Sequence, residues 1–256
     1  MKKRLMAAVL STAMAATMLL TGSISVQAAD AAAANDPAVE LIFTSVSVSG
    51  DSHTEAMYEF ADKVEELSGG SVTCKCYDNG SLFSSENEFD ALLNGDADLA
   101  YISFPTIATQ IPSYSMFASG YLFSSYEHMT SVLNGDIGLN KIRPQIEETL
   151  NIKPLSSFYL GSRVINTREK EINSYDDMNG LLLRMPNSEA WLFLGEALGA
   201  NPTPLSFSEL YTALQTGAVD AQDNPLPSIE SAKFYEVTKY IAITNHVVDS
   251  IMPCIN

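Results

Sequence analysis

Basic residues and long apolar runs are scarce in this chain of 256 residues. Its 14 lysines and arginines are outnumbered by 31 aspartates and glutamates, which gives a formal net charge of −17 at pH 7. A nucleic-acid partner requires a basic surface, so this balance argues against one. After the first residues, no stretch is apolar over the length that spans a bilayer, and we expect no direct insertion into a membrane.

Cysteines and metal-binding motifs are also scarce. The three cysteines form no CxxC pair and no HExxH sequence occurs, so a metal site has no support and we expect no cofactor. Cys74 and Cys76 lie two residues apart on a predicted strand, where a disulfide between them has poor geometry. A bridge from Cys254 to one of them is the alternative, and we favour buried, unbridged thiols.

Residues 1–28 have the pattern of a secretory signal peptide. A charged start is followed by small and apolar residues up to Leu20 and by an A-x-A-like cleavage site ending at Ala28. The run is short for a transmembrane helix, which is the alternative. We expect cleavage near Ala28, a small-residue linker over 29–38 and a mature protein in the periplasm or otherwise outside the cytoplasm.

Residues 39–160 predict the first of two α/β lobes. Hydrophobic periodicity indicates a βαβαβ series, which implies a parallel, doubly wound sheet. The expected strands are Val39–Phe43, Val72–Tyr77 and Leu99–Ser103, and the expected helices are His53–Leu67 and one that a capping-box pattern opens at Ser85–Glu88. A helix over Ile137–Leu150, interrupted by Pro144, and a strand over Ile152–Leu160 follow.

Residues 161–236 predict the second lobe. The apolar run Leu181–Leu183 suits a buried strand, and Pro186 forbids its continuation. Arg184 and Asn187 therefore lie at the C-terminal end of a strand, which is where open α/β sheets bind ligands.

A helix, a short link, a second helix and another strand follow in this lobe. Trp191 shares helical spacing with apolar neighbours and is expected in the core. Ser206 or Ser208 can cap the second helix, and Gly217 fits the position after its last turn. The strand after it ends at Asn224-Pro225.

An internal repeat supports two related lobes. Phe89–Asp98 aligns with Tyr211–Asp220, and an aromatic residue, alanine, leucine, glycine and aspartate recur in register. The same helix–glycine–strand unit in each series indicates two lobes with a cleft between them. We expect the chain to change lobes near Tyr159–Gly161 and residues 237–256 to return to the first lobe.

The C-terminal residues predict a strand over Val237–Ile243 and then a mostly apolar segment, Val247–Ile255, with nothing after it to cover it. We interpret the sequence as lacking a C-terminal part. An uncovered apolar surface favours aggregation, so we expect residues 29–256 to express poorly or to be loosely packed.

Several segments occur in a characteristic order along the chain. They are 112–128, Gly161-Ser162-Arg163, 176–181 with Arg184-Met185-Pro186, 199–204, 209–217, 219–225 and 233–237. Together they resemble the solute-binding proteins of tripartite ATP-independent periplasmic (TRAP) transporters, the DctP-like family. The resemblance extends from about Val39 to the end, and its departures are Ala221 and Asp223 in place of the usual Gly and Glu and Gly120 in place of a frequent Pro.

The resemblance implies a two-lobed, periplasmic-binding-protein-like fold whose doubly wound sheets are connected by hinge strands. Such a protein closes around an organic anion and hands it to the membrane permease subunits of a TRAP transporter driven by an ion gradient. We expect a monomer. Which acid is bound stays open among C4-dicarboxylates, 2-oxo acids, sugar acids and sialic acid.

The resemblance also implies roles for individual residues. Arg184 pairs with the ligand carboxylate, Phe207 packs against the ligand body and Asn224 forms a hydrogen bond with it. Arg163 matches a second arginine near the ligand, and Glu86 an acidic position on the opposing lobe. The remaining matches are Asn187, Ser103 and Phe104.

Each of these residues also has an ordinary structural interpretation. An arginine such as Arg184 or Arg163 commonly pairs with a carboxylate of the same chain, although its planar fork also suits the carboxylate of a ligand. Phe207 can belong to the core, Asn224 to a turn before proline and Glu86 to the start of a helix.

Two other functions stay open as alternatives. A secreted α/β enzyme acting on an organic acid would share the fold, but the sequence has no G-x-S-x-G elbow and no recognisable triad, so we expect no catalytic residues. A ligand-sensing lobe that serves a receptor is the other alternative.

Overall fold

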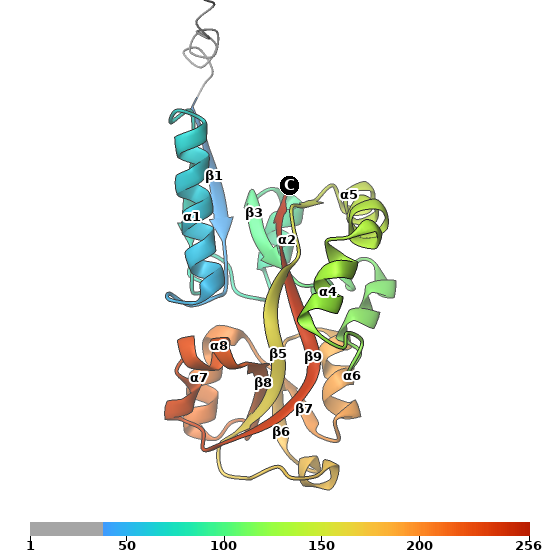
Figure 1. Cartoon of the computed structure of the whole chain (residues 1–256). Helices are drawn as coiled ribbons and strands as arrows, with labels where there is room; N and C mark the ends of the chain where they lie inside the picture. Colours follow the sequence, from blue (N-terminus) through green and yellow to red (C-terminus); the bar gives the residue numbers. More distant parts are fainter. Residues whose placement is uncertain (1–37) are drawn as a thin grey trace, which may run out of the picture. The chain divides into compact units, whose positions relative to one another are not determined.

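Nine strands form one mixed sheet in the order β2-β1-β3-β9-β5-β8-β6-β7, with β4 paired to β9. The computed structural model describes residues 38–256 (Figure 1), so the predicted signal peptide and nearly all of the predicted linker lie outside the described residues. Helices cover both faces of the sheet, which confirms the predicted doubly wound α/β architecture.

The first series is parallel, as predicted, because β1 pairs with β2 on one side and with β3 on the other. Its elements are β1 (Val39–Thr44), α1 (Ser52–Leu67), β2 (Val72–Tyr77), α2 (Glu88–Asn94) and β3 (Leu99–Ile102). The chain continues through α3 (Phe104–Ile107), η1 (Pro112–Ala118), α4 (Tyr126–Leu133), η2 (Gly138–Ile142), α5 (Arg143–Leu150) and β4 (Lys153–Pro154).

Two predictions about helix starts in this series have different outcomes. The capping box at Ser85 is wrong, because α2 begins only at Glu88 and the Ser85 hydroxyl donates to the neighbouring Glu86 carboxylate. The interruption at Pro144 is confirmed: this residue lies in the first turn of α5, where a missing N–H is tolerated, and the preceding turn is a π-helix.

The second series repeats the arrangement, because β6 pairs in parallel with both β7 and β8. Its elements are η3 (Tyr175–Met178), β6 (Leu182–Met185), α6 (Glu189–Ala197), β7 (Asn201–Pro204), α7 (Phe207–Thr216), β8 (Ala221–Pro225), α8 (Leu226–Ser231) and η4 (Phe234–Glu236). The predicted short link between the two helices is in fact the strand β7, which forms an edge of the sheet.

Two long antiparallel strands join the series (Figure 1). β5 (Phe158–Thr167) and β9 (Tyr240–Ile255) pair along most of β5, and β9 continues along β3 while β5 pairs with β8. The prediction that Val247–Ile255 is uncovered is wrong, because this segment is the inner part of β9. Met252 and Cys254 within it are fully buried.

The internal repeat has a structural counterpart at two equivalent turns. Gly95 after α2 and Gly217 after α7 both adopt left-handed backbone conformations, with φ of 77° and 80°. The aspartate three residues later then accepts a hydrogen bond from a backbone N–H of the adjacent strand, from Ile42 to Asp98 in one series and from Leu182 to Asp220 in the other.

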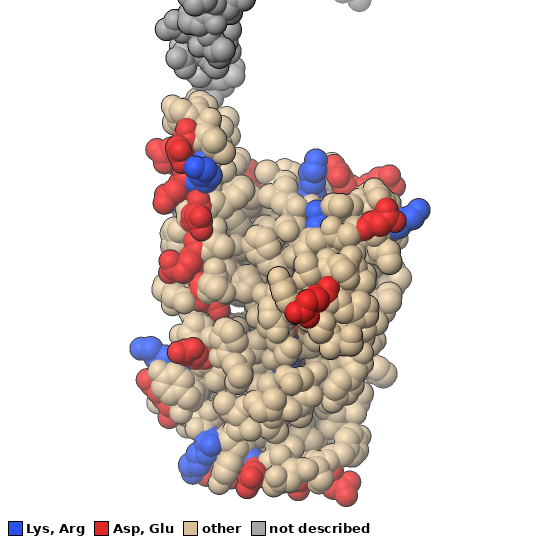
Figure 2. All heavy atoms as spheres, in the orientation of Figure 1, with Lys and Arg blue, Asp and Glu red and all other residues tan. Residues whose placement is uncertain are grey.

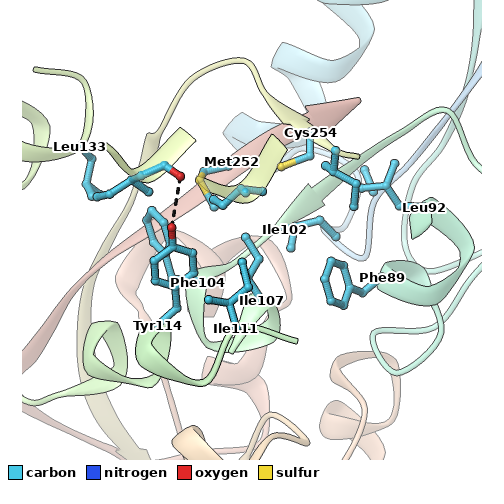
Figure 3. Packing of buried hydrophobic residues seen from close by; sticks show 14 of the residues in the cluster. Phe89, Leu92, Ile102, Phe104, Ile107, Ile111, Tyr114, Leu133, Met252 and Cys254 are labelled. Carbon is cyan, nitrogen blue, oxygen red and sulfur yellow. Dashed lines mark hydrogen bonds between the residues drawn. The ribbon is translucent and has the colours of Figure 1, made fainter. Parts of the chain in front are cut away.

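The largest apolar cluster lies between β3, β9 and the helices that follow β3 (Figure 3). Phe104 stacks on Phe117 there, with 4.1 Å between ring centroids, and it is 2% exposed. The Tyr114 hydroxyl at the edge of this cluster donates to the Ile142 carbonyl. On the other face of the same strands, α1 covers a smaller cluster.

All three cysteines are free thiols. Cys254 is buried, which raises the pKa of its thiol far above the usual range, whereas Cys74 and Cys76 are only partly buried. The expectation of unbridged thiols is therefore confirmed. The surface is visibly acidic along α1 (Figure 2), which carries five acidic residues and the single basic residue Lys63.

Candidate ligand-binding site

A cavity of about 380 Å³ lies where the carboxyl ends of β1, β3, β6 and β8 meet the turn before α2 and the first turn of α7. This volume is within the range of small-molecule sites. The carboxyl ends of strands are also where open α/β sheets bind ligands. Seven of the eight predicted site residues line it, namely Glu86, Ser103, Arg163, Arg184, Asn187, Phe207 and Asn224.

Arg184 is the penultimate residue of β6 and is only 2% exposed. Its neighbours Leu183 and Met185 point into the apolar cluster under α6, so the alternation of the strand turns Arg184 to the opposite face. Its Nε donates to the Leu205 carbonyl at 2.8 Å. Among the described residues, no hydrogen bond or ion pair engages its two terminal nitrogens, and burial lowers the pKa of Arg184 to about 10.

Arg163 on β5 is similarly buried, but each of its three guanidinium nitrogens donates a hydrogen bond. Its guanidinium donates from Nε to Asp223 Oδ2 at 2.8 Å and from Nη1 to Asp249 Oδ2 at 2.7 Å. Nη2 donates to the Asp223 carbonyl and to its Oδ1. Burial opposes the charge of Arg163, but the two carboxylates outweigh it and raise the pKa of the arginine beyond its usual value.

Aromatic rings cover both arginines. The Arg163 guanidinium lies 4.4 Å from the ring centroid of Trp191 on α6, a distance at which a cation is attracted to the face of an indole. The Arg184 guanidinium lies 5.9 Å from the ring centroid of Phe207, the first residue of α7. These rings give the cavity apolar walls beside its charged groups.

The two asparagines occupy different positions. Asn224 on β8 is 6% exposed, and its amide donates to Gln222 Oε1 at 2.6 Å while its Oδ1 faces Arg163 Nη2 at 3.4 Å. Asn187 is exposed at the rim, two residues after β6 ends. Both lie within reach of a molecule in the cavity.

Glu86 and Ser103 line the opposite wall. The Glu86 carboxylate accepts hydrogen bonds from Ser206 at the N-cap of α7 and from Ser85. Burial raises the pKa of Glu86, but the hydrogen bonds from Ser206, Ser84 and Ser85 outweigh it, so its pKa is lowered and the group is ionised. Ser206 was predicted to cap α7, and its hydroxyl instead bridges the cavity.

Phe104 is the predicted site residue that does not line the cavity. It follows Ser103 directly, but its ring points into the core cluster (Figure 3). The ring stacks there on Phe117. Its contribution to the site is to fix the start of α3, with Ser103 at the N-cap position and Thr106 accepting or donating a hydrogen bond at 2.9 Å.

Several residues that line the cavity were not predicted as site residues from the sequence. Trp191 was expected in the core, and it is 3% exposed, yet one face of its ring meets Arg163. Asp249 was hidden in a segment interpreted as apolar, although its acidic side chain in such a run is itself a signal. Asp51 was given no role from the sequence, and Glu88 was interpreted only as part of a capping-box pattern.

Glu88 is buried, at 4% exposed, and Oε1 of its carboxyl has no hydrogen-bond partner. Burial raises the pKa of Glu88 to about 8. The Thr44 hydroxyl lies beside this carboxyl and partly offsets the effect of burial, but no hydrogen bond of normal geometry joins the two groups. Glu88 is therefore a neutral acid at pH 7.

No histidine or cysteine lines the cavity, and the described residues contain no cluster of three or more potential metal ligands. A buried, unpaired guanidinium is costly by itself, so it favours an anion in the cavity.

Comparisons with known proteins identify the family. The model of bacterial extracellular solute-binding proteins, family 7, matches residues 43–256. The chain is 35% identical to the sialic acid-binding periplasmic protein of Vibrio cholerae over 196 residues. These aligned residues make up 77% of this chain and 60% of that protein.

Solved structures agree. A TRAP periplasmic solute-binding protein from Roseobacter denitrificans with bound 3-deoxy-D-manno-oct-2-ulosonic acid is 40% identical, with a TM-score of 0.80 over 85% of this chain and 72% of that chain. The sugar acid binding protein of Advenella mimigardefordensis, in complex with galactonate, is 32% identical, with a TM-score of 0.79 over 86% and 71%.

This chain therefore belongs to the bacterial extracellular solute-binding proteins of family 7, the DctP family of TRAP solute-binding proteins. Members of the family are substrate-binding transport proteins. The chain spans about three fifths of the length of the curated relatives it matches most strongly. Within residues 38–256, no helix is long and apolar enough to cross a membrane.

Proposed function

We propose that this protein captures a small organic acid outside the cytoplasm and delivers it to the membrane permease of a TRAP transporter. The observation that carries the proposal is Arg184, a buried arginine at the cavity whose terminal nitrogens have no partner among the described residues. A guanidinium fork matches a carboxylate in geometry and charge. The relatives described above, whose names specify sialic acid or whose structures hold a sugar acid, support the same class of ligand.

The other cavity residues have supporting roles in this proposal. Arg184 holds the carboxylate, Phe207 packs against the body of the acid, and Asn224 and Asn187 form hydrogen bonds with it. Arg163 orders the cavity wall through Asp223 and Asp249 rather than binding the acid with its full charge. Glu86 and Ser103 contact the acid from the opposite wall.

We further propose how the parts of the chain serve this function. Residues 1–28 direct export and are removed near Ala28, and residues 29–38 form a linker. Residues 39–160 with the return segment 237–256 form lobe I, and residues 161–236 form lobe II. The two lobes close around the acid. The protein acts as a monomer.

The test is calorimetric titration of Arg184→Ala and Arg184→Lys with galactonate and 3-deoxy-D-manno-oct-2-ulosonic acid, preceded by mass spectrometry of any acid that co-purifies. Loss of one partner of a buried charge pair costs about 2–5 kcal/mol, so Arg184→Ala should bind roughly 30- to several-thousand-fold more weakly. Lysine keeps the charge without the fork, so Arg184→Lys should bind weakly but better than alanine.

Arg168→Ala is the matched control, because Arg168 does not line the cavity. It should bind like the unaltered protein. If Arg184→Ala binds within about threefold of the unaltered protein while folding normally, well short of the loss expected for a buried charge pair, the carboxylate is held elsewhere.

A further inference from the structure

Carboxyl groups outnumber arginines in the lining of the cavity. Two arginines line it, and so do five carboxyl groups, those of Asp51, Glu86, Glu88, Asp90 and Asp249. Building on the proposed function, we infer that the cavity selects acids with one carboxylate and several hydroxyl groups and rejects dicarboxylates. Selectivity depends on which of these charges are available to a ligand.

Only one full positive charge is available among the described residues. Arg184 has two terminal nitrogens without partners. Arg163 forms ion pairs with Asp223 and Asp249, and Trp191 covers one face of its guanidinium. At most one N–H of Arg163, on Nη1, lacks a partner, and two carboxylates already compensate its charge. A second ligand carboxylate therefore finds no free cation.

The first series contributes anionic groups to the cavity. Glu86, before α2, lines the same cavity as Arg184 of the second series. Burial lowers the pKa of Arg184, and the negative charge of Glu86 partly offsets this effect. Asp51 lies further along the same wall, where His53 and Ser231 donate to it. Burial raises the pKa of Asp51, but hydrogen bonds from His53 outweigh it, so the pKa is lowered and Asp51 is ionised.

These two carboxylates treat a carboxylate and a hydroxyl in opposite ways. Like charges placed side by side across an interface cost several kcal/mol. A ligand hydroxyl can instead donate to a carboxylate, and hydrogen bonds to charged groups are among the stronger ones in proteins. Glu86 and Asp51 therefore repel the second carboxylate of a diacid and attract the hydroxyl groups of a sugar acid.

Neutral polar groups complete this wall. Ser103, Thr106, Thr109 and Gln110 line the cavity in and after α3, and each can both donate and accept. Burial keeps Glu88 neutral at pH 7, so it adds no charge but offers a further polar group. Several ligand hydroxyls can therefore find hydrogen-bond partners in the cavity, whereas the second carboxylate of a diacid finds carboxylates and neutral polar groups but no second free cation.

The test compares pairs of acids that differ only in the second carboxylate. Calorimetric titration of the protein is made with D-galactonate against galactarate and D-gluconate against glucarate, and with succinate as a short diacid. At least one aldonate should bind about tenfold or more tightly than its matched aldarate and than succinate. Equal or tighter binding of the diacids overturns the inference but leaves the proposed function intact.

Variants then identify the source of the selectivity. Glu86→Gln removes the repulsive charge, so the ratio of aldonate to aldarate affinity should fall at least threefold, while Glu209→Gln, on the exposed face of α7, should leave it unchanged. An unchanged ratio in Glu86→Gln overturns the assignment. If none of the aldonates binds, this inference fails. If the acids bind Arg184→Ala as they bind the unaltered protein, the carboxylate is held elsewhere and the inference fails with the proposed role of Arg184.

Discussion

The two buried arginines of the cavity have similar exposure, but only one of them has carboxylate partners. Arg163, at 3% exposed, is compensated by Asp223 and Asp249, whereas Arg184 has no compensating ion pair among the described residues. From the sequence, both arginines were predicted to lie at the ligand. Only the positions of the two aspartates, one on β8 and one on β9, separate an arginine that orders the wall from one that is free to bind.

This difference predicts opposite effects on stability in the absence of ligand. Arg163→Ala leaves the buried Asp249 carboxylate without a cation and Asp223 with only His246 beside it, and it should lower the free energy of unfolding by about 3–5 kcal/mol. Arg184→Ala removes a buried charge without a partner and gives up one hydrogen bond, so it should change that energy by less than about 1 kcal/mol. Urea denaturation of both variants without ligand measures the two effects. Equal destabilisation by the two substitutions would contradict this account of the cavity.

Among the elements, β5 brings the cavity residues together at its crossing between the two series. Its pairing with β9 shifts register between Tyr159 and Gly161. Gly161 has φ of 135°, and a Cβ built on it would lie 2.4 Å from Cβ of Pro225, the residue after Asn224. The missing side chain of Gly161 therefore leaves room for the Pro225 ring, while the pairing of β5 with β8 places Pro225 opposite Arg163.

Gly161→Ala should therefore be destabilising for two reasons. The overlap with Pro225 should cost about 1–3 kcal/mol, to which the unfavourable backbone conformation adds. Gly180→Ala is the matched control, because Gly180 also has positive φ, of 78°, but a Cβ there meets nothing within 4 Å. The urea midpoints of both variants give the comparison. Similar losses in the two variants would show that the contact with Pro225 is unimportant.

The order of helices and strands was largely predictable because local signals agree with the tertiary structure. Gly95 and Gly217 end α2 and α7 in the left-handed conformation that their sequence positions indicate. β7 was missed because Pro202 and Pro204 remove two donors, which only an edge strand tolerates. The edge position of a strand is a property of the sheet and is not written in its own residues.

The extent of β9 and several cavity residues depended on distant partners. Local pattern divided β9 into a strand and an apolar segment, whereas pairing with β3 and β5 makes it continuous. Trp191 has the spacing of a core residue, and only the position of Arg163 on another strand turns its ring into a cavity wall. Arg184 and Asn187 were placed correctly because a proline ends their strand nearby.

For the whole molecule, the cavity is bounded by residues from both series, and two hydrogen bonds join its walls directly. Ser206 at the start of α7 donates to Glu86 before α2, and Ser231 at the end of α8 donates to Asp51 before α1 at 3.3 Å. Within residues 38–256, only β5 and β9 cross between the two series as strands, which suits a hinge. An acid that contacts both walls stabilises the closed arrangement over an open one.

The prediction for the whole molecule is a ligand-dependent change in compactness. Solution scattering should give a smaller radius of gyration with a bound acid than without it, because the acid links Arg184 on one wall to the hydroxyl and carboxylate groups on the other.

The double variant Ser206→Ala, Ser231→Ala should be more open without ligand. Each lost hydrogen bond is worth about 0.5–1.5 kcal/mol, so this variant should bind the acid at least roughly fivefold more weakly while still closing around it. Ser208→Ala, which alters a neighbouring hydroxyl outside this cavity, is the control and should behave like the unaltered protein. Scattering profiles that are identical with and without acid would show that the two lobes do not move on β5 and β9.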